Sequence, residues 1–134
     1  DKVIKEADSI GVSSRLHLLS GVNDDELNVI YKKAEVFVYP SRYEGFGIPV
    51  IEAILSGLPV VACTGSCLEE AGGPDCSYVH PDDAEGMSAA VMHLLNDKEE
   101  CRRRITASLE YVQKYKGTNI AEQVFRLYKS IHNS

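Results

Sequence analysis

The sequence predicts an α/β fold in which a parallel sheet is covered by helices on both faces. Three short, largely apolar runs, "EVFVYP", "LPVVACT" and "CSYVH", have the character of strands that are buried on both sides. Segments with helical spacing of apolar residues separate these runs, and this alternation is typical of a parallel sheet. The length of 134 residues suits one compact domain, which we expect to span residues 1–134.

The first third of the chain predicts a helix, two strands and a second helix. Residues 2–9 indicate the end of a helix closed by Gly11, and "RLHLLS" after it indicates a short buried strand. Asn23 and Glu26 have the spacing of a capping box and begin the second helix. That helix carries Leu27, Ile30, Tyr31 and Ala34 on one face. The strand "EVFVYP" then ends at Pro40.

The remaining elements follow in the same alternation. A helix is expected from Ile48 to Ser56, closed by Gly57, with Pro49 at its first position and Ile48 as its N-cap. The strand "LPVVACT" comes next, and Ser66 with Glu69 indicates a short helix before "CSYVH". A helix is expected from Asp82 to Asp97, followed by two more at about 98–115 and 119–131. The arginine run at 102–104 is expected on a solvated helix face.

Four cysteines raise the question of a metal site or a disulfide. Cys63 and Cys67, with Cys76 and His80 further on, imitate the spacing of zinc ligands. Cys63 ends one apolar run and Cys76 opens another, however, so we favour small buried residues of strands and predict no metal. Reduced thiols are expected, and a Cys63–Cys67 disulfide stays open as an alternative.

Charge and hydropathy limit the partners. The net charge is −6 and the basic residues are spread along the chain, so a nucleic-acid surface is not expected. No apolar run approaches the length that spans a bilayer, and the first residues lack the layout of a signal peptide. We therefore expect a cytoplasmic protein.

The stretch "YEGFGIPVIEA", residues 43–53, carries the chemistry. Gly45 and Gly47 keep side chains away from a helix start, where backbone amides and the helix dipole attract anions such as a pyrophosphate. Glu44 and Glu52 lie on either side of that start, and carboxylates accept hydrogen bonds from sugar hydroxyls. A ligand with hydroxyls on both sides of a pyrophosphate is a nucleotide sugar.

Each acid also has a simpler explanation. Glu52 alone could complement the helix dipole, and Glu44 alone could be a solvated loop residue. The whole stretch nevertheless favours a ligand site, because it follows a parallel strand at the edge where open α/β sheets bind ligands.

The block "AEVFVYPSRYEGFGIPVIEAILSGLPVVAC" resembles the C-terminal domain of GT-B glycosyltransferases, in particular the large retaining family numbered four. The family's motif of two glutamates separated by seven residues is filled by Glu44 and Glu52. The similarity continues less sharply over residues 10–97. It implies a Rossmann-like sheet and a transferase that moves a hexose from a nucleotide-diphosphate sugar to an acceptor with retention of configuration, in glycan biosynthesis.

The resemblance also implies roles for individual residues. Glu44 would contact the donor hexose and is catalytic only in positioning it, and Glu52 would hold the ribose. The backbone from Gly45 through Phe46 and Gly47 to Ile48 would meet the sugar and diphosphate, with Phe46 shaping the pocket. Gly21 would lie near the nucleotide base, or form a plain turn. No cofactor, metal or protein nucleophile is implied.

Other family features are not seen in this sequence. The first strand, loop and helix of the family's domain, with its basic Arg and Lys, is absent, as is the N-terminal domain that would bind a sugar, lipid-linked or other hydroxyl acceptor. We therefore expect this fragment to be inactive alone. The resemblance also allows a peripheral membrane association of the full-length protein.

Two alternatives remain open at this point. The chain could belong to another GT-B enzyme, such as a nucleotide-sugar epimerase, whereas a phosphorylase is disfavoured because no lysine is well placed for a Schiff base. It could also be a non-catalytic Rossmann-like interaction module. Nucleotide-sugar binding that depends on Glu44 and Glu52 would separate these cases.

Overall fold

The computed structural model describes residues 2–40, 47–65 and 67–115. Three strands form one parallel sheet in the order β1-β2-β3: β1 (Phe37–Tyr39), β2 (Val60–Cys63) and β3 (Ser77–Val79). Phe37 pairs with Val60, and Val61 pairs with Ser77. The predicted α/β class with a parallel sheet is confirmed.

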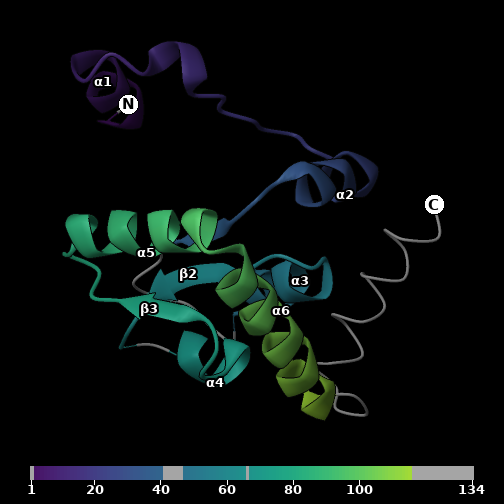
Figure 1. The fold of residues 1–134 in the computed structure, drawn as a ribbon. Helices are drawn as coiled ribbons and strands as arrows, with labels where there is room; N and C mark the ends of the chain where they lie inside the picture. The colour runs from purple at the N-terminus through teal and green to yellow at the C-terminus, as the bar shows by residue number, and fades with distance from the viewer. Residues whose placement is uncertain (1, 41–46, 66, 116–134) are drawn as a thin grey trace.

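Helices cover both faces of this sheet (Figure 1). α3 (Ile48–Leu55) and α4 (Leu68–Gly72) pack against each other and against the sheet, while α5 (Ala84–Asn96) covers the opposite face. α6 (Lys98–Val112) runs from the end of α5 across α3 and α4 and ends in the 3₁₀ turn η2 (Gln113–Tyr115). The core lies around α3 and β2, because every residue of β2 is buried and α3 is apolar on most of its surface.

The N-terminal elements extend away from this body. α1 (Lys2–Ser9) and the 3₁₀ turn η1 (Ser13–Arg15) contact each other and lie apart from the sheet in Figure 1. Gly11 follows α1 with a φ of +76°, as expected for a residue that closes a helix. An extended segment then leads to α2 (Asp24–Lys33), which lies above α3.

The strand predicted from "RLHLLS" is wrong. Leu16 has extended backbone angles, but residues 16–20 join no ladder, and the side chains of Leu18 and Leu19 are 54% and 63% exposed. An extended segment becomes a strand only when a neighbouring strand satisfies its backbone groups, and none of the described residues does so here.

Two predicted helix caps were misplaced by one residue. α3 begins after Gly47, which has φ +90° and ψ 35°, so Ile48 occupies the first helical position and Pro49 the second. α5 is capped by Asp83, whose carboxylate accepts from the amide of Gly86 at 2.8 Å, and not by Asp82. In both cases the sequence pattern fits two adjacent positions, and the backbone hydrogen bonds decide between them.

Other local predictions can be compared directly. The capping box of Asn23 and Glu26 is present at α2, and its prediction is confirmed. Arg104 departs from the expected solvated face, since it is half-buried and donates to the carbonyl of Asp75 at 3.1 Å. Ser66 and the helix predicted at 119–131 lie outside the described residues.

Candidate functional site

The candidate site is built around the start of α3. β1 runs toward Pro40, and the chain re-enters the described part at Gly47, so α3 begins at the carboxyl end of the parallel strands. The carbonyl of Gly47 accepts from the amides of Val50 at 3.0 Å and Ile51 at 3.3 Å. These bonds fix the first turn of α3.

Gly47 is confined by its neighbours as well as by its backbone angles. A Cβ at this position would lie 3.0 Å from Cδ2 of Leu68 and 3.1 Å from Cβ of Ala71. Both neighbours belong to α4 and are fully buried. Only glycine therefore lets α4 approach the start of α3 this closely.

Fewer amides are available at this helix start than the sequence indicated. Pro49 at the second position has no N–H, and Val50 already donates to Gly47. Within the described residues, the amide of Ile48 is the one in the first three helical positions without a backbone acceptor. An anion at this point would meet a single helical amide together with whatever residues 44–46 supply.

Glu52 lies one turn inside α3 and is half-buried. The hydroxyl of Tyr31 on α2 lies near enough for the two groups to shift each other's pKa. Burial raises the pKa of Glu52, the Tyr31 hydroxyl opposes this, and nearby Asp24 raises it further. The side chain is thus a hydrogen-bond acceptor that is partly withdrawn from water.

Tyr31 is a residue of this site that sequence reasoning assigned only to the core. It is 7% exposed, and its ring lies 6.1 Å from that of Phe37, tilted by 58°. Burial, and then the charge of Glu52, raise its pKa to about 12, so its hydroxyl is a proton donor at any physiological pH. The available signal was a tyrosine on an apolar helix face, because a buried hydroxyl usually has a polar partner.

The structure places the other predicted residues as follows. Gly47, Ile48 and Glu52 come together on one helix. Gly21, with φ +66° and open space around it, lies in the segment that leads to the cap of α2, and no contact joins it to α3 among the described residues. Glu44, Gly45 and Phe46 lie outside the described residues.

One cavity of about 230 Å³ lies away from the predicted site residues. It lies by α5 and the start of α6 and is lined by Glu35, Leu94, Leu95, Lys98, Cys101 and Arg102. Within the described ranges, no group of three or more His, Cys, Asp or Glu is placed to hold a metal ion. Cys63 and Cys76 are buried, and neither they nor Cys67 and Cys101 form a disulfide among the described residues.

Comparisons with known proteins place this site in context. Residues 1–110 match the model of a family described as "Glycosyl transferases group 1". The chain is 41% identical over 106 residues to the MMP alpha-(1->4)-mannosyltransferase of Mycolicibacterium hassiacum, which covers 77% of this chain and 25% of the relative. It is 32% identical over 114 residues to the O-antigen chain mannosyltransferase B of Escherichia coli, covering 85% and 30%.

A solved structure has a similar fold. Sucrose-phosphate synthase from Thermosynechococcus elongatus superposes with a TM-score of 0.79 at 28% identity, over 98% of this chain and 34% of that one. The chain thus spans about a third or less of the length of these proteins. No helix among the described residues combines the length and apolar character needed to cross a membrane.

Proposed function

This chain belongs to the Glycosyl transferases group 1 family, and on that basis we propose that it is the donor-binding part of a retaining glycosyltransferase with the GT-B fold. The full-length enzyme would move a hexose from a nucleotide-diphosphate sugar to a hydroxyl acceptor. The observation that carries this proposal is the half-buried Glu52, which lies one turn inside a helix that begins at the carboxyl end of the sheet.

We assign each site residue a part in donor binding. Glu52 would accept hydrogen bonds from the ribose hydroxyls, and the amide of Ile48 with the backbone of residues 45–47 would face the diphosphate. Glu44 would contact the hexose and position its anomeric carbon. Gly21, which precedes the cap of α2, would lie toward the base. No protein nucleophile and no metal take part in this proposal.

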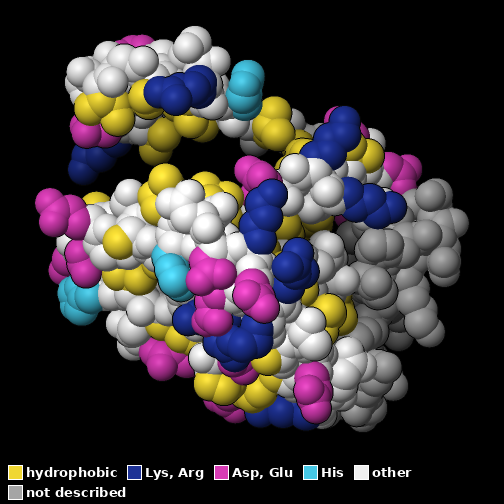
Figure 2. All heavy atoms as spheres, in the orientation of Figure 1, with side chains coloured by type: hydrophobic (Ala, Val, Ile, Leu, Met, Phe, Trp, Pro, Cys, Tyr) yellow, Lys and Arg dark blue, Asp and Glu magenta, His cyan; other side chains and the backbone are white. Residues whose placement is uncertain are grey.

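The exposed apolar surfaces support a domain that contains more residues than this chain. Val38 of β1 is 40% exposed, and among the described strands β1 pairs only with β2. Figure 2 also shows apolar side chains on both sides of an open hollow between α1 and α5. The exposed apolar residues of these helices are Val3 and Ile4 on α1 and Met92 and Leu95 on α5. We propose that further strands of the full-length protein fill this hollow, because contiguous exposed apolar surface marks an interface.

We propose that donor binding and acceptor binding belong to different parts of the full-length protein. The missing part would supply basic side chains for the diphosphate and a second domain for the acceptor, which could be a sugar or a lipid-linked molecule at the cytoplasmic membrane surface. The 134-residue chain would then bind donor without transferring sugar. Because the two relatives above are named mannosyltransferases, an activated mannose is the first donor to test.

The test is an amide NMR titration of this chain with GDP-mannose and with UDP- and ADP-sugars. Shifts concentrated at residues 43–53 for one nucleotide are expected, and Glu52→Gln should weaken them. Glu110→Gln, an exposed acid on α6, serves as the matched control and should leave binding unchanged. If Glu52→Gln leaves nucleotide-sugar binding unchanged, or if the full-length protein binds no nucleotide sugar, the result would favour the interaction module or the epimerase instead.

A further inference from the structure

The last turn of α4 cannot satisfy all of its own carbonyl groups. The amide of Gly73 donates to the carbonyl of Glu69 at 2.9 Å, which is the ordinary bond of an α-helix. The next carbonyl, that of Glu70, would need the amide four residues on, and that nitrogen belongs to Pro74 and carries no hydrogen. Carbonyls at a helix end that lack an intrahelical donor need other partners. The Glu70 carbonyl therefore depends on donors from elsewhere in the fold.

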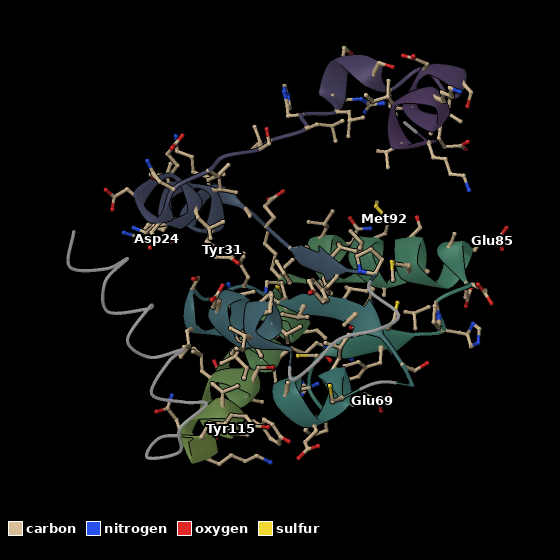
Figure 3. The ribbon with its side chains drawn as sticks, turned by 180° about the vertical axis from the view of Figure 1, so that it is seen from behind. Asp24, Tyr31, Glu69, Glu85, Met92 and Tyr115 are labelled. Atoms are coloured by element: carbon tan, nitrogen blue, oxygen red, sulfur yellow. The ribbon has the colours of Figure 1, made fainter. Side chains whose placement is uncertain are left out.

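Two tyrosines supply these donors. The hydroxyl of Tyr111 on α6 donates to the carbonyl of Glu70 at 2.7 Å, and the hydroxyl of Tyr115 on η2 donates to the same oxygen. Figure 3 shows Tyr115 at the end of the α6–η2 segment, which packs against the short helix that carries Glu69. A carbonyl oxygen has two lone pairs, so two hydroxyls can bind to it at once. These bonds join α4 to the C-terminal end of α6.

The two rings are themselves fixed by packing. The ring of Tyr111 lies against Gly73, where an added Cβ would be 2.5–2.7 Å from three of its carbon atoms. The ring of Tyr115 meets that of Tyr111 edge-on, with centroids 6.2 Å apart and planes at 76°. The Nζ of Lys114 donates to the Tyr111 hydroxyl oxygen at 2.7 Å. Rings packed in this way have little freedom to turn away from their shared acceptor.

The helix α4 also forms a wall of the candidate site. Leu68 and Ala71 are fully buried, and both lie at contact distance from the position that a Cβ on Gly47 would occupy. Gly47 begins α3, and the carbonyl of this residue holds the first turn of that helix. At the other end of α3, nothing lies within 4 Å of a Cβ added to Gly57. A displacement of α4 would therefore act on the start of α3 before it acts on the end.

We propose that Tyr111 and Tyr115 are positioning residues for the donor site, because they hold α4 against Gly47 and so keep the amide of Ile48 directed at the donor diphosphate. The inference rests on the proposed function in naming the diphosphate. The holding of α4 is a property of the chain itself and can be tested without any ligand. Both tyrosines follow residues 1–110, the part that matches the family model, so a segment outside that match takes part in the site.

The first experiment measures amide hydrogen exchange in Tyr111→Phe, Tyr115→Phe and the double variant without ligand. Each single variant leaves one hydroxyl on the Glu70 carbonyl and should change exchange less than about twofold. The double variant should speed exchange of the Val50 amide, which donates to the carbonyl at the start of α3, by about three- to tenfold, the usual effect of losing one hydrogen bond. The Leu58 amide, which closes the other end of α3, should be unchanged.

Gln113→Ala is the matched control, because Gln113 lies between the two tyrosines and donates to the carbonyl of Leu109 in its own segment at 3.1 Å. It should change neither amide. Equal acceleration at Val50 and Leu58 in the double variant would indicate a general loss of stability and overturn the proposal, as would an unchanged Val50. If the double variant does not fold, the single variants decide: the amide resonance of Ile48 should shift more than that of Leu58, and equal shifts refute the proposal.

The second experiment measures the affinity of this chain for UDP, GDP and ADP and for the corresponding nucleosides. The double variant should weaken binding of the diphosphate about three- to tenfold and leave the nucleoside unaffected, because the start of α3 faces the diphosphate. Equal losses for both ligands would contradict a positioning role. If no nucleotide binds the chain or its full-length protein, the proposed function fails, while the exchange experiment still decides whether the two tyrosines hold α4.

Discussion

Gly47→Ala tests whether the start of α3 is fixed by tight packing against α4. Two costs combine at this position. The φ of +90° is unfavourable for any residue with a Cβ, and the new methyl would lie 3.0 Å from Leu68 and 3.1 Å from Ala71. Neither neighbour can yield easily, because both are fully buried and the Ala71 methyl is fixed to the backbone of α4.

The magnitude follows from separating these costs. A left-handed conformation costs an L-residue about 1–2 kcal/mol, of which about 0.4–1 kcal/mol is offset because alanine restricts the unfolded chain. Overpacking a buried contact adds about 1–3 kcal/mol. Gly47→Ala should therefore lower the free energy of unfolding by about 2–4 kcal/mol.

Gly57→Ala is the matched control. Gly57 closes the other end of α3 with a φ of +86°, but nothing lies within 4 Å of an added Cβ. It should lose about 1 kcal/mol, from the backbone alone. Urea unfolding followed by circular dichroism measures both variants, with equal m-values required for the comparison. A Gly47→Ala that loses no more stability than Gly57→Ala would refute the packing argument.

Three further predictions concern stability and titration. Since folding raises the pKa of Glu52 above 4.5, its stabilising contribution is complete below that pH and is lost as pH rises through the folded pKa. Glu52→Gln should therefore raise the melting temperature at pH 7 and leave it unchanged at pH 4. Gly73→Ala, whose Cβ would lie 2.5–2.7 Å from the Tyr111 ring at φ +84°, should cost more than 3 kcal/mol in urea unfolding, by about the sum of strain and overpacking. Arg103, with a smaller contribution from Arg104, lowers the pKa of Glu100 to about 2, so the contribution of these exposed ion pairs persists above the ordinary 4.5 and disappears as pH falls toward 2; Arg103→Gln should raise the pKa of Glu100, measured by ¹³C titration, part of the way toward its usual range.

Local rules predicted the elements whose signals are contained in a few residues. The capping box at Asn23 needs only Glu26 and the backbone between them, so it could be identified without knowing what α2 packs against. The apolar run that became β2 was identified for the same reason, because a central strand buried on both faces has little choice of composition.

The failures came where a distant partner decides. Residues 16–20 have the composition of a strand, but a ladder requires a second strand, and the described part supplies none beside them. The cap of α3 depended on α4 in a similar way, since the close approach of Leu68 and Ala71 is what requires glycine at position 47. Neither contact is visible in a local pattern.

The same difference between local and distant signals applies to the candidate site. Glu52 was predicted from a motif contained in eleven residues, whereas Tyr31 lies 21 positions earlier and has the spacing of a core residue. Its ring does pack in the core. Its hydroxyl and the Glu52 carboxylate shift each other's pKa, and no periodicity in the sequence predicts such a pairing. A buried tyrosine on the helix before such a motif should therefore be checked for a nearby carboxylate. A buried hydroxyl without a hydrogen-bond partner destabilises the fold, so a polar group is expected beside it.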